Sequence, residues 1–232
     1  MPSTLNWWMR CVGSLQNRLR RPRAVVLHGE GEHFCAGLDL SEVRELDTME
    51  GLLLSRMWHR AFAAIEGGDL PVIAVLRGAI IDGGLELAAT AHIRIAEPST
   101  FYALPEGQRG NFVGGGSVRI PRLIGVPRMS DMILTGRTCG AADGAAIGLS
   151  QYQPAAGEGL SLAMTLASRI ASNTRLTNFA VMHALPRIAE ADPAGGFLTE
   201  GLMSAVAISD REAKQRLADF IEKRTTKVAH RE

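Results

Sequence analysis

Two glutamates, Glu86 and Glu106, lie 20 residues apart, and each follows a turn marked by glycine or proline. Two carboxyl groups in unequal environments can act as an acid and a base on the two protons of a water molecule. A helix and one or two short strands fit between them, so both could return to the same end of a sheet. Each also has an ordinary structural interpretation, since a glutamate in the first turn of a helix favours the macrodipole and a turn glutamate is commonly a surface residue.

Two glycine-containing turns could supply main-chain N–H donors to a developing negative charge. The segment HFCAGLDL exposes the N–H of Leu38 before an expected helix, for which Asp39 or Ser41 could be the N-cap. In IIDGGLELA, Gly83 turns the chain before a helix that starts near Leu85, and the first N–H groups of a helix have no partner within it. A pair of donors from separate loops is what an oxyanion hole requires. For HFCAGLDL alone, an ordinary turn between a strand and a helix is the competing interpretation.

The elements that must position these residues alternate between strand and helix in the first half of the chain. Short apolar or β-branched runs predict strands at 24–29, 71–76, 92–97 and 101–104. Helical spacing predicts helices at 1–20, 51–66 and 85–91, and later at 178–185, 199–208 and 210–224. Glycine-rich loops are expected at 29–37, 77–84 and 105–116. This alternation indicates an α/β fold with parallel strands, in which ligands bind where loops leave the carboxyl ends of the strands.

Composition excludes several classes of protein. The 232 residues carry a net charge of +1, which argues against a nucleic-acid partner because phosphate binding needs clustered excess Lys and Arg. Three scattered cysteines and six scattered histidines show no metal-ligand spacing, so no metal site is expected. The sequence has no apolar run long enough to span a bilayer and no secretory pattern at its start, so a cytoplasmic protein without a membrane partner is expected.

Several segments, in register, resemble the enoyl-CoA hydratase/isomerase family, also called the crotonase family. They are FCAGLDL, GGLELA after PVIAVLRGAI, ALPEGQRG, GGGSVRIPRLIG, TGRTCGAADGAAIGL and ISDREAKQRLADFIEKR. The similarity covers roughly residues 20–228. It implies a spiral of ββα units with the CoA-thioester site over residues 1–155, and a helical oligomerisation region over 156–232. It also implies a homotrimer or a hexamer built as a dimer of trimers, an acyl-CoA thioester as substrate, and no cofactor beyond the CoA of that substrate.

The resemblance also assigns roles to individual residues. Leu38 and Gly83 match the positions whose amides form the oxyanion hole for the thioester carbonyl, and Glu86 and Glu106 match the two catalytic glutamates. In that mechanism Glu106 protonates the α-carbon while Glu86 orients or deprotonates the attacking water. The further positions implied to contact substrate or CoA are Ala36, Gly37, Asp39, Gly84, Gly114, Phe220 and Lys223.

The resemblance therefore implies a hydro-lyase that adds water across the 2,3 double bond of an enoyl-CoA. An isomerase or an aromatic acyl-CoA hydratase or lyase of the same family is the first alternative, and an impaired CoA-binding or assembly protein is the second. Two departures bear on the second alternative. Asp82 stands where the family usually has glycine, beside the expected oxyanion hole, and the family's first strands are expected to be missing or replaced by the segment MPSTLNWWMRCVG.

Overall fold

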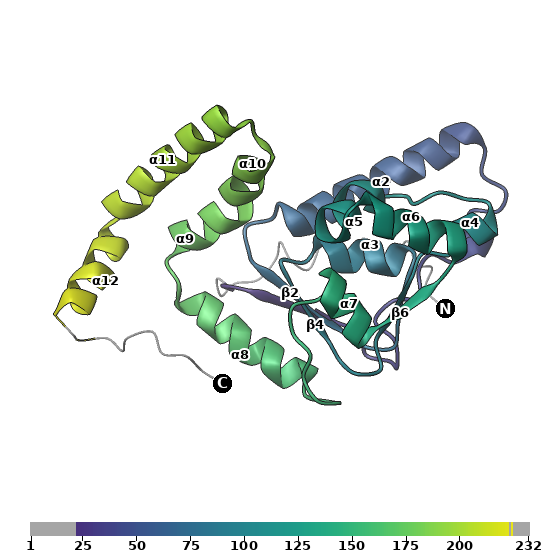
Figure 1. The fold of residues 1–232 in the computed structure, drawn as a ribbon, viewed down its shortest axis with the longest axis horizontal. Helices are drawn as coiled ribbons and strands as arrows, with labels where there is room; N and C mark the ends of the chain where they lie inside the picture. Colours follow the sequence, from purple (N-terminus) through teal and green to yellow (C-terminus); the bar gives the residue numbers. More distant parts are fainter. Residues whose placement is uncertain (1–21, 223, 225–232) are drawn as a thin grey trace. The chain divides into compact units, whose positions relative to one another are not determined.

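The structure, a computed structural model, describes residues 22–222 and 224. It divides into one compact unit that ends at Ile170 and a second that starts at Ala171. Within the described residues, all strands belong to the first unit, and the second is helical (Figure 1). The helix expected over residues 1–20 lies outside the described residues.

The first sheet contains the strands β1 (Val25–His28), β2 (Val72–Leu76) and β4 (Ile93–Ala96), all parallel, in the order β1-β2-β4. Alternate residues of β2 face opposite sides of this sheet. Ala74 packs into the larger core, whereas Ile73 and Val75 pack with α8 (Gly159–Ser172). Every residue of β2 is therefore buried, which explains its unbroken apolar sequence VIAVL. The strands expected at 24–29, 71–76 and 92–97 are confirmed.

The second sheet contains a strand that the sequence analysis assigned to a loop. Residues Ala79–Ile81 form β3, which pairs in parallel with β5 (Phe101–Ala103), and β5 pairs in antiparallel fashion with β6 (Thr138–Gly140). The expectation of a loop over 77–84 is thus wrong for its middle part. The three apolar residues of β3 are too few to show the two-residue alternation that predicts a strand. They form a strand because they pair with β5, which is distant in the sequence.

Several helices cover the sheets of the first unit. They are α2 (Thr48–Glu66), α3 (Gly83–Thr90), α4 (Glu106–Arg109), α5 (Gly116–Ile124), α6 (Val126–Thr135), α7 (Ala141–Ile147) and α8, with a short 3₁₀ turn, η1, at Leu40–Glu42. Helix α2 begins before the predicted residue 51 because Asp47 and Glu50 form a reciprocal capping box. The loop expected over 105–116 contains α4, whose single turn starts at Glu106.

The second unit contains α9 (Arg175–Phe179), a π-helical turn η2 (Ala180–Ala184), α10 (Leu185–Glu190), α11 (Pro193–Ser209) and α12 (Arg211–Ile221). The side chains of Asp192 and Asp210 cap the starts of α11 and α12. These helices cover the segments that the sequence predicted to be helical near the end of the chain.

Candidate active site

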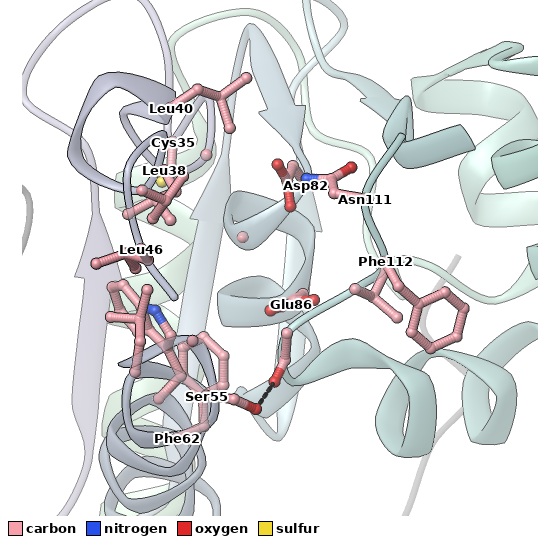
Figure 2. A pocket seen from close by; sticks show the side chains of 18 of the residues that line it. Cys35, Leu38, Leu40, Leu46, Ser55, Phe62, Asp82, Glu86, Asn111 and Phe112 are labelled. Carbon is pink, nitrogen blue, oxygen red and sulfur yellow. Dashed lines mark hydrogen bonds between the residues drawn. The ribbon is translucent and has the colours of Figure 1, made fainter. Parts of the chain in front are cut away.

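A cavity of about 420 Å³ lies in the first unit, where three loops meet α2. The loops carry Cys35 to Leu38, Asp82 and Gly83, and Asn111 to Gly114. Figure 2 shows the side chains of Leu38, Asp82 and Glu86 around this cavity, with Leu46 and Phe62 on the side of α2 and its preceding loop. The first two loops follow β1 and β3, as expected for a ligand site in an α/β fold, and the third follows α4.

The main-chain amides of Leu38 and Gly83 are neighbours at the edge of this cavity. A Cβ atom added to Gly83 would lie 3.9 Å from the nitrogen of Leu38. Gly37 brings the chain there in a left-handed conformation, with a φ of 97°. Among the described residues, the structure shows no acceptor for either N–H, and Gly83 is the first residue of α3, where such donors are unpaired. Two donors are thus available at one edge of the cavity.

Close backbone contact holds these two segments together. Cys35 pairs with Ile80 in an isolated parallel bridge, in which its N–H donates to Ala79 and its carbonyl accepts from Ile81. Gly84 packs directly against the backbone of Cys35. A Cβ atom added to Gly84 would lie only 2.0 Å from the Cys35 carbonyl oxygen. This crossing of the chain requires glycine at position 84 and makes the spacing of the two amides rigid.

Glu86 points into the cavity from the first turn of α3 and is 3% exposed. Burial raises the pKa of this carboxyl, and the negative charge of Asp82 acts in the same direction. The main-chain amides of Gly115, Gly116 and Gly114 oppose the shift in pKa. Its Oε1 has no hydrogen-bond partner among the described residues, so Glu86 keeps an open acceptor.

Glu106 is completely buried at the start of α4. Burial raises its pKa to about 7, with further contributions from the charges of Asp82 and Glu86 and from a hydrogen-bond contact with the Asp82 carboxyl. The main-chain N–H of Glu106 opposes this shift in pKa, and neither carboxyl oxygen has a partner at hydrogen-bond geometry among the described residues. The two glutamates are therefore electrostatically connected and differ in environment, as an acid and base pair requires.

The side of the cavity opposite these carboxyl groups is apolar. It is lined by Leu40, Val43, Leu46, Leu54, Trp58, Phe62 and Val113. Trp58 and Phe62, one helical turn apart on α2, form a tilted ring pair with centroids 5.7 Å apart. Sequence analysis did not identify these wall residues, although the spacing of Leu54, Trp58 and Phe62 at every fourth position is the signal that could have found them.

The comparisons with known proteins agree with this geometry. The sequence model of the enoyl-CoA hydratase/isomerase family matches residues 11–231. The chain belongs to this family. The resemblance inferred from the motifs is confirmed, and so is the prediction of an α/β fold of the crotonase type with a helical C-terminal region.

Individual members of the enoyl-CoA hydratase/isomerase family align over most of the chain. A short-chain-enoyl-CoA hydratase of Clostridium acetobutylicum is 32% identical over 215 residues, which cover 92% of this chain and 82% of that protein. The crystal structure of a candidate enoyl-CoA hydratase from Rhodopseudomonas palustris has 55% identity and a TM-score of 0.90, with 96% of this chain and 87% of that chain covered. The fatty acid oxidation complex subunit alpha of Shewanella amazonensis is 43% identical over 117 residues, but these are only 49% of this chain and 17% of that subunit.

The structure brings together only part of the predicted site of this family member. Leu38, Gly83, Glu86, Gly37 and Gly114 line the cavity, and Glu106 lies buried behind it rather than among the lining residues. Gly84 packs against the backbone of Cys35. Ala36 is exposed and does not line the cavity.

Asp39 and Phe220 are not among the residues that line this cavity. Asp39 is exposed and caps η1, accepting hydrogen bonds from the Ser41 N–H at 3.0 Å and from the Ser41 hydroxyl at 2.7 Å, which lower the pKa of Asp39. Phe220 is an exposed residue of α12 in the second unit. Lys223 lies outside the described residues.

Two further observations concern the described part of the chain as a whole. No group of three His, Cys, Asp or Glu side chains there is arranged to hold a metal ion. None of the helices there combines the length and the apolar character that crossing a bilayer would need.

Proposed function

We propose that this protein is an acyl-CoA hydratase that adds water across the 2,3 double bond of an enoyl-CoA thioester. The carrying observation is that two unpaired amides, of Leu38 and Gly83, border the same cavity as the Glu86 carboxyl, whose charge also raises the pKa of the buried Glu106. Relatives named enoyl-CoA hydratases, similar over most of the chain, support the assignment.

The oxyanion donors would act on the thioester oxygen. Hydrogen bonds from the Leu38 and Gly83 amides to this oxygen withdraw electron density from the conjugated double bond and make the β-carbon electrophilic. The apolar wall formed by α2 and its neighbours holds the acyl chain.

The two carboxyl groups would divide the protons of water between them. Glu86, as the carboxylate, accepts one proton from the water whose oxygen attacks the β-carbon, and electron density collects on the thioester oxygen. The α-carbon then takes a proton that originates on Glu106, whose raised pKa keeps it protonated near neutral pH. After the product leaves, Glu86 releases its proton and Glu106 regains one from solvent, so the enzyme returns to its starting state.

We also propose that the enzyme works as a homotrimer or a dimer of trimers through its helical C-terminal region. Helix α11 exposes several large apolar side chains, namely Phe197, Leu198, Leu202, Val206 and Ile208. A helix that is apolar on most sides is normally buried. A cytoplasmic location and a requirement for no cofactor beyond CoA remain predictions from the sequence.

A spectroscopic assay with Glu106→Gln tests the hydratase proposal. Wild-type protein mixed with a short 2-enoyl-CoA should bleach the ultraviolet absorbance of the conjugated thioester as water adds. Glu106→Gln should lower this rate by about 10²- to 10⁴-fold, the usual contribution of a positioned acid or base, with CoA-thioester binding retained. Glu158→Gln, an isosteric change at an exposed carboxyl outside the cavity, should behave as wild type.

Each other outcome has a definite meaning. Bleaching that persists unchanged in Glu106→Gln would remove Glu106 from the mechanism. If the wild-type protein bleaches no unsaturated thioester but moves a double bond or splits an acyl-CoA, the isomerase or lyase alternative replaces the hydratase.

A further inference from the structure

The glycine segment 114–116 is packed tightly between α2 and the Glu86 carboxyl. A Cβ atom added to Gly115 would lie 2.9 Å from the ring of Phe62 on one side and 3.4 Å from Oε2 of Glu86 on the other. At Gly116 an added Cβ would lie 2.8 Å from Cγ of Glu86 and 3.3 Å from its Oε1. Glu86 therefore has no free room on this side, and the position of its carboxyl depends on where the segment lies.

Arg119, one turn into α5, fixes the middle of this segment. Its Nη1 donates to the carbonyl of Gly115 at 3.1 Å, and its Nε and Nη2 both lie 2.8 Å from Oε2 of Glu66 on α2. Its side chain is only 13% exposed, and its guanidinium carbon lies 5.7 Å from the centroid of the Phe62 ring. A planar guanidinium with several donors can make all of these contacts at once. Arg119 thus ties the segment to two residues of α2 that are one turn apart.

Ser55 fixes the beginning of the segment. Its hydroxyl donates to the carbonyl of Gly114 at 3.2 Å, and Figure 2 shows this hydrogen bond on the side of the cavity formed by α2. Ser55 lines the cavity two helical turns before Phe62. Both contacts of the segment with polar side chains thus go to its carbonyl oxygens, one to Gly114 and one to Gly115.

The two carbonyl contacts set the direction of the next two amides. In a trans peptide the C=O and the N–H of one peptide unit point in opposite directions. The hydrogen bonds to the carbonyls of Gly114 and Gly115 therefore turn the N–H groups of Gly115 and Gly116 away from Ser55 and Arg119. These amides, with that of Gly114, are the groups that lower the pKa of Glu86 against the effect of its burial. They also begin α5, where the helix macrodipole favours a negative charge.

We propose that Arg119 and Ser55 are positioning residues, which hold the main chain of residues 114–116 against Glu86 so that its carboxylate lies where it orients the attacking water. The packing of the segment against Glu86 is independent of turnover, while its role in catalysis rests on the hydratase function proposed above.

The positioning residues make and break no covalent bond. Glu86 accepts the proton of water as described above, and its Oε1 has no hydrogen-bond partner among the described residues, so this oxygen is available to the water. The water oxygen must lie in line with the β-carbon when it attacks. A displacement of about 1 Å in such a site can lower the rate by about 10²-fold. Loss of either contact to the segment should therefore act on kcat.

Charged groups around Glu86 lie on each neighbouring element. Asp82 precedes it at the start of α3 and Glu106 lies at the start of α4, and their charges act on those of the other carboxyl groups. Arg119 comes from α5 and pairs with Glu66 of α2. The other ionisable side chains of the cavity and of these helices are Cys35 and Asp47 in the cavity, Arg109 on α4, and the exposed Glu50, Arg56, His59, Arg60 and Arg122. Ser55→Ala leaves all of these charges in place, whereas Arg119→Gln removes one.

The first test measures Glu86 in the full-length protein without substrate. Carbon-13 NMR of protein labelled at its Glu carboxyl carbons, titrated with pH, identifies the Glu86 signal by its loss in Glu86→Gln. Ser55→Ala should raise the midpoint of this titration, because the amides of a displaced segment stabilise the carboxylate less. Arg119→Gln should raise it further, since it also removes a positive charge. Arg119→Lys keeps the charge but not the planar fork, so its midpoint should still lie above that of wild type.

Arg128→Gln is the matched control. Arg128 also donates to the carbonyl four residues before it, that of Ile124, at 3.1 Å, but it is on α6 and does not line the cavity. Its replacement should leave both the Glu86 midpoint and kcat at the values of wild type.

The outcomes of the titration separate this proposal from the hydratase function. A Glu86 midpoint equal to that of wild type in folded Ser55→Ala and Arg119→Gln overturns the positioning, even if the enzyme hydrates enoyl-CoA normally. If Arg119→Gln does not fold, Ser55→Ala decides alone, because it removes only one hydroxyl group. Raised midpoints in a protein that hydrates no thioester support the positioning of Glu86 and overturn the hydratase function instead.

Turnover separates positioning of Glu86 from a general structural role. At the pH optimum of each variant, kcat should fall about 10- to 100-fold in Arg119→Gln and about two- to tenfold in Ser55→Ala, the usual value of one hydrogen bond. KM should change by less than about twofold, because the amides of Leu38 and Gly83 are unaltered. The low-pH limb of the kcat profile should move to higher pH in both variants. A raised KM with the kcat of wild type would show that the two residues shape substrate binding and do not act through Glu86.

Discussion

At the scale of single residues, carboxyl groups of this chain acquire opposite properties from their surroundings. Asp39 lies in solvent and accepts two hydrogen bonds from Ser41, which lower its pKa. Glu106 is buried with no partner at hydrogen-bond geometry among the described residues, and its pKa rises to about 7. The second environment costs folding free energy once the pH rises above 4.5, but it provides a carboxyl that can still donate a proton at neutral pH.

The raised pKa of Glu106 predicts a pH-dependent stability. Below its ordinary value of 4.5 the carboxyl is protonated in both the folded and the unfolded chain. Between 4.5 and about 7 the unfolded chain releases this proton and the folded chain keeps it, so the free energy of unfolding falls as pH rises. The whole contribution is about 3 kcal/mol.

Urea unfolding at pH 5 and pH 8 measures this contribution. The free energy of unfolding of Glu106→Gln, relative to wild type, should be higher at pH 8 than at pH 5 by about 2 kcal/mol, because glutamine cannot ionise. Glu158→Gln should show the same pH dependence as wild type. Parallel pH curves for wild type and Glu106→Gln would mean that Glu106 is ionised in the folded protein at much lower pH.

At the scale of elements, the site depends on the crossing of the segment that contains Cys35 with the start of α3. The chain passes so closely that residue 84 has no room for a side chain, whereas residue 83 faces open space near Leu38. The two adjacent glycines thus serve different purposes. Gly84 permits the close backbone contact with Cys35, and Gly83 lies beside the main-chain nitrogen of Leu38.

Alanine at each glycine should separate these purposes. Gly84→Ala places a methyl group 2.0 Å from the Cys35 carbonyl oxygen, and the backbone must move, so the free energy of unfolding should fall by about 1–3 kcal/mol or more. In Gly83→Ala the nearest atoms are 3.9 Å away, so its stability should stay within about 1 kcal/mol of wild type. Thermal unfolding by circular dichroism would compare them, and equal losses in both variants would contradict the crossing.

At the scale of the whole molecule, the second unit presents apolar surface that a monomer would leave in water. The helix α11 is the clearest case, since Phe197 is 72% exposed and Leu202 is 61% exposed. Large exposed apolar patches commonly mark protein–protein contacts. This surface is the physical basis for the proposed oligomer.

Leu202→Asp tests this assignment. A carboxylate at the centre of an apolar contact carries a desolvation cost, so the molar mass by size-exclusion chromatography with light scattering should fall toward that of one chain. Glu200→Gln changes the charge of the same helix by one unit without removing an apolar group, and it should keep the mass of the wild type. A wild-type mass for Leu202→Asp, or a monomeric wild type, would show that α11 does not hold an oligomer together.

The sequence by itself determined the family, the strands of the first sheet, and the positions of Leu38, Gly83 and Glu86 next to their turns. These features follow from local patterns, because glycine turns, apolar runs and the residues beside them are read within a few positions. The tertiary structure decided the rest. The strand β3 depends on pairing with β5, and the wall of Trp58 and Phe62 depends on how α2 is oriented. The burial of Glu106 and the effect of the Asp82 charge on its pKa depend on segments that meet only in the folded chain, because desolvation and charge proximity are set by distance in space and not by distance in sequence.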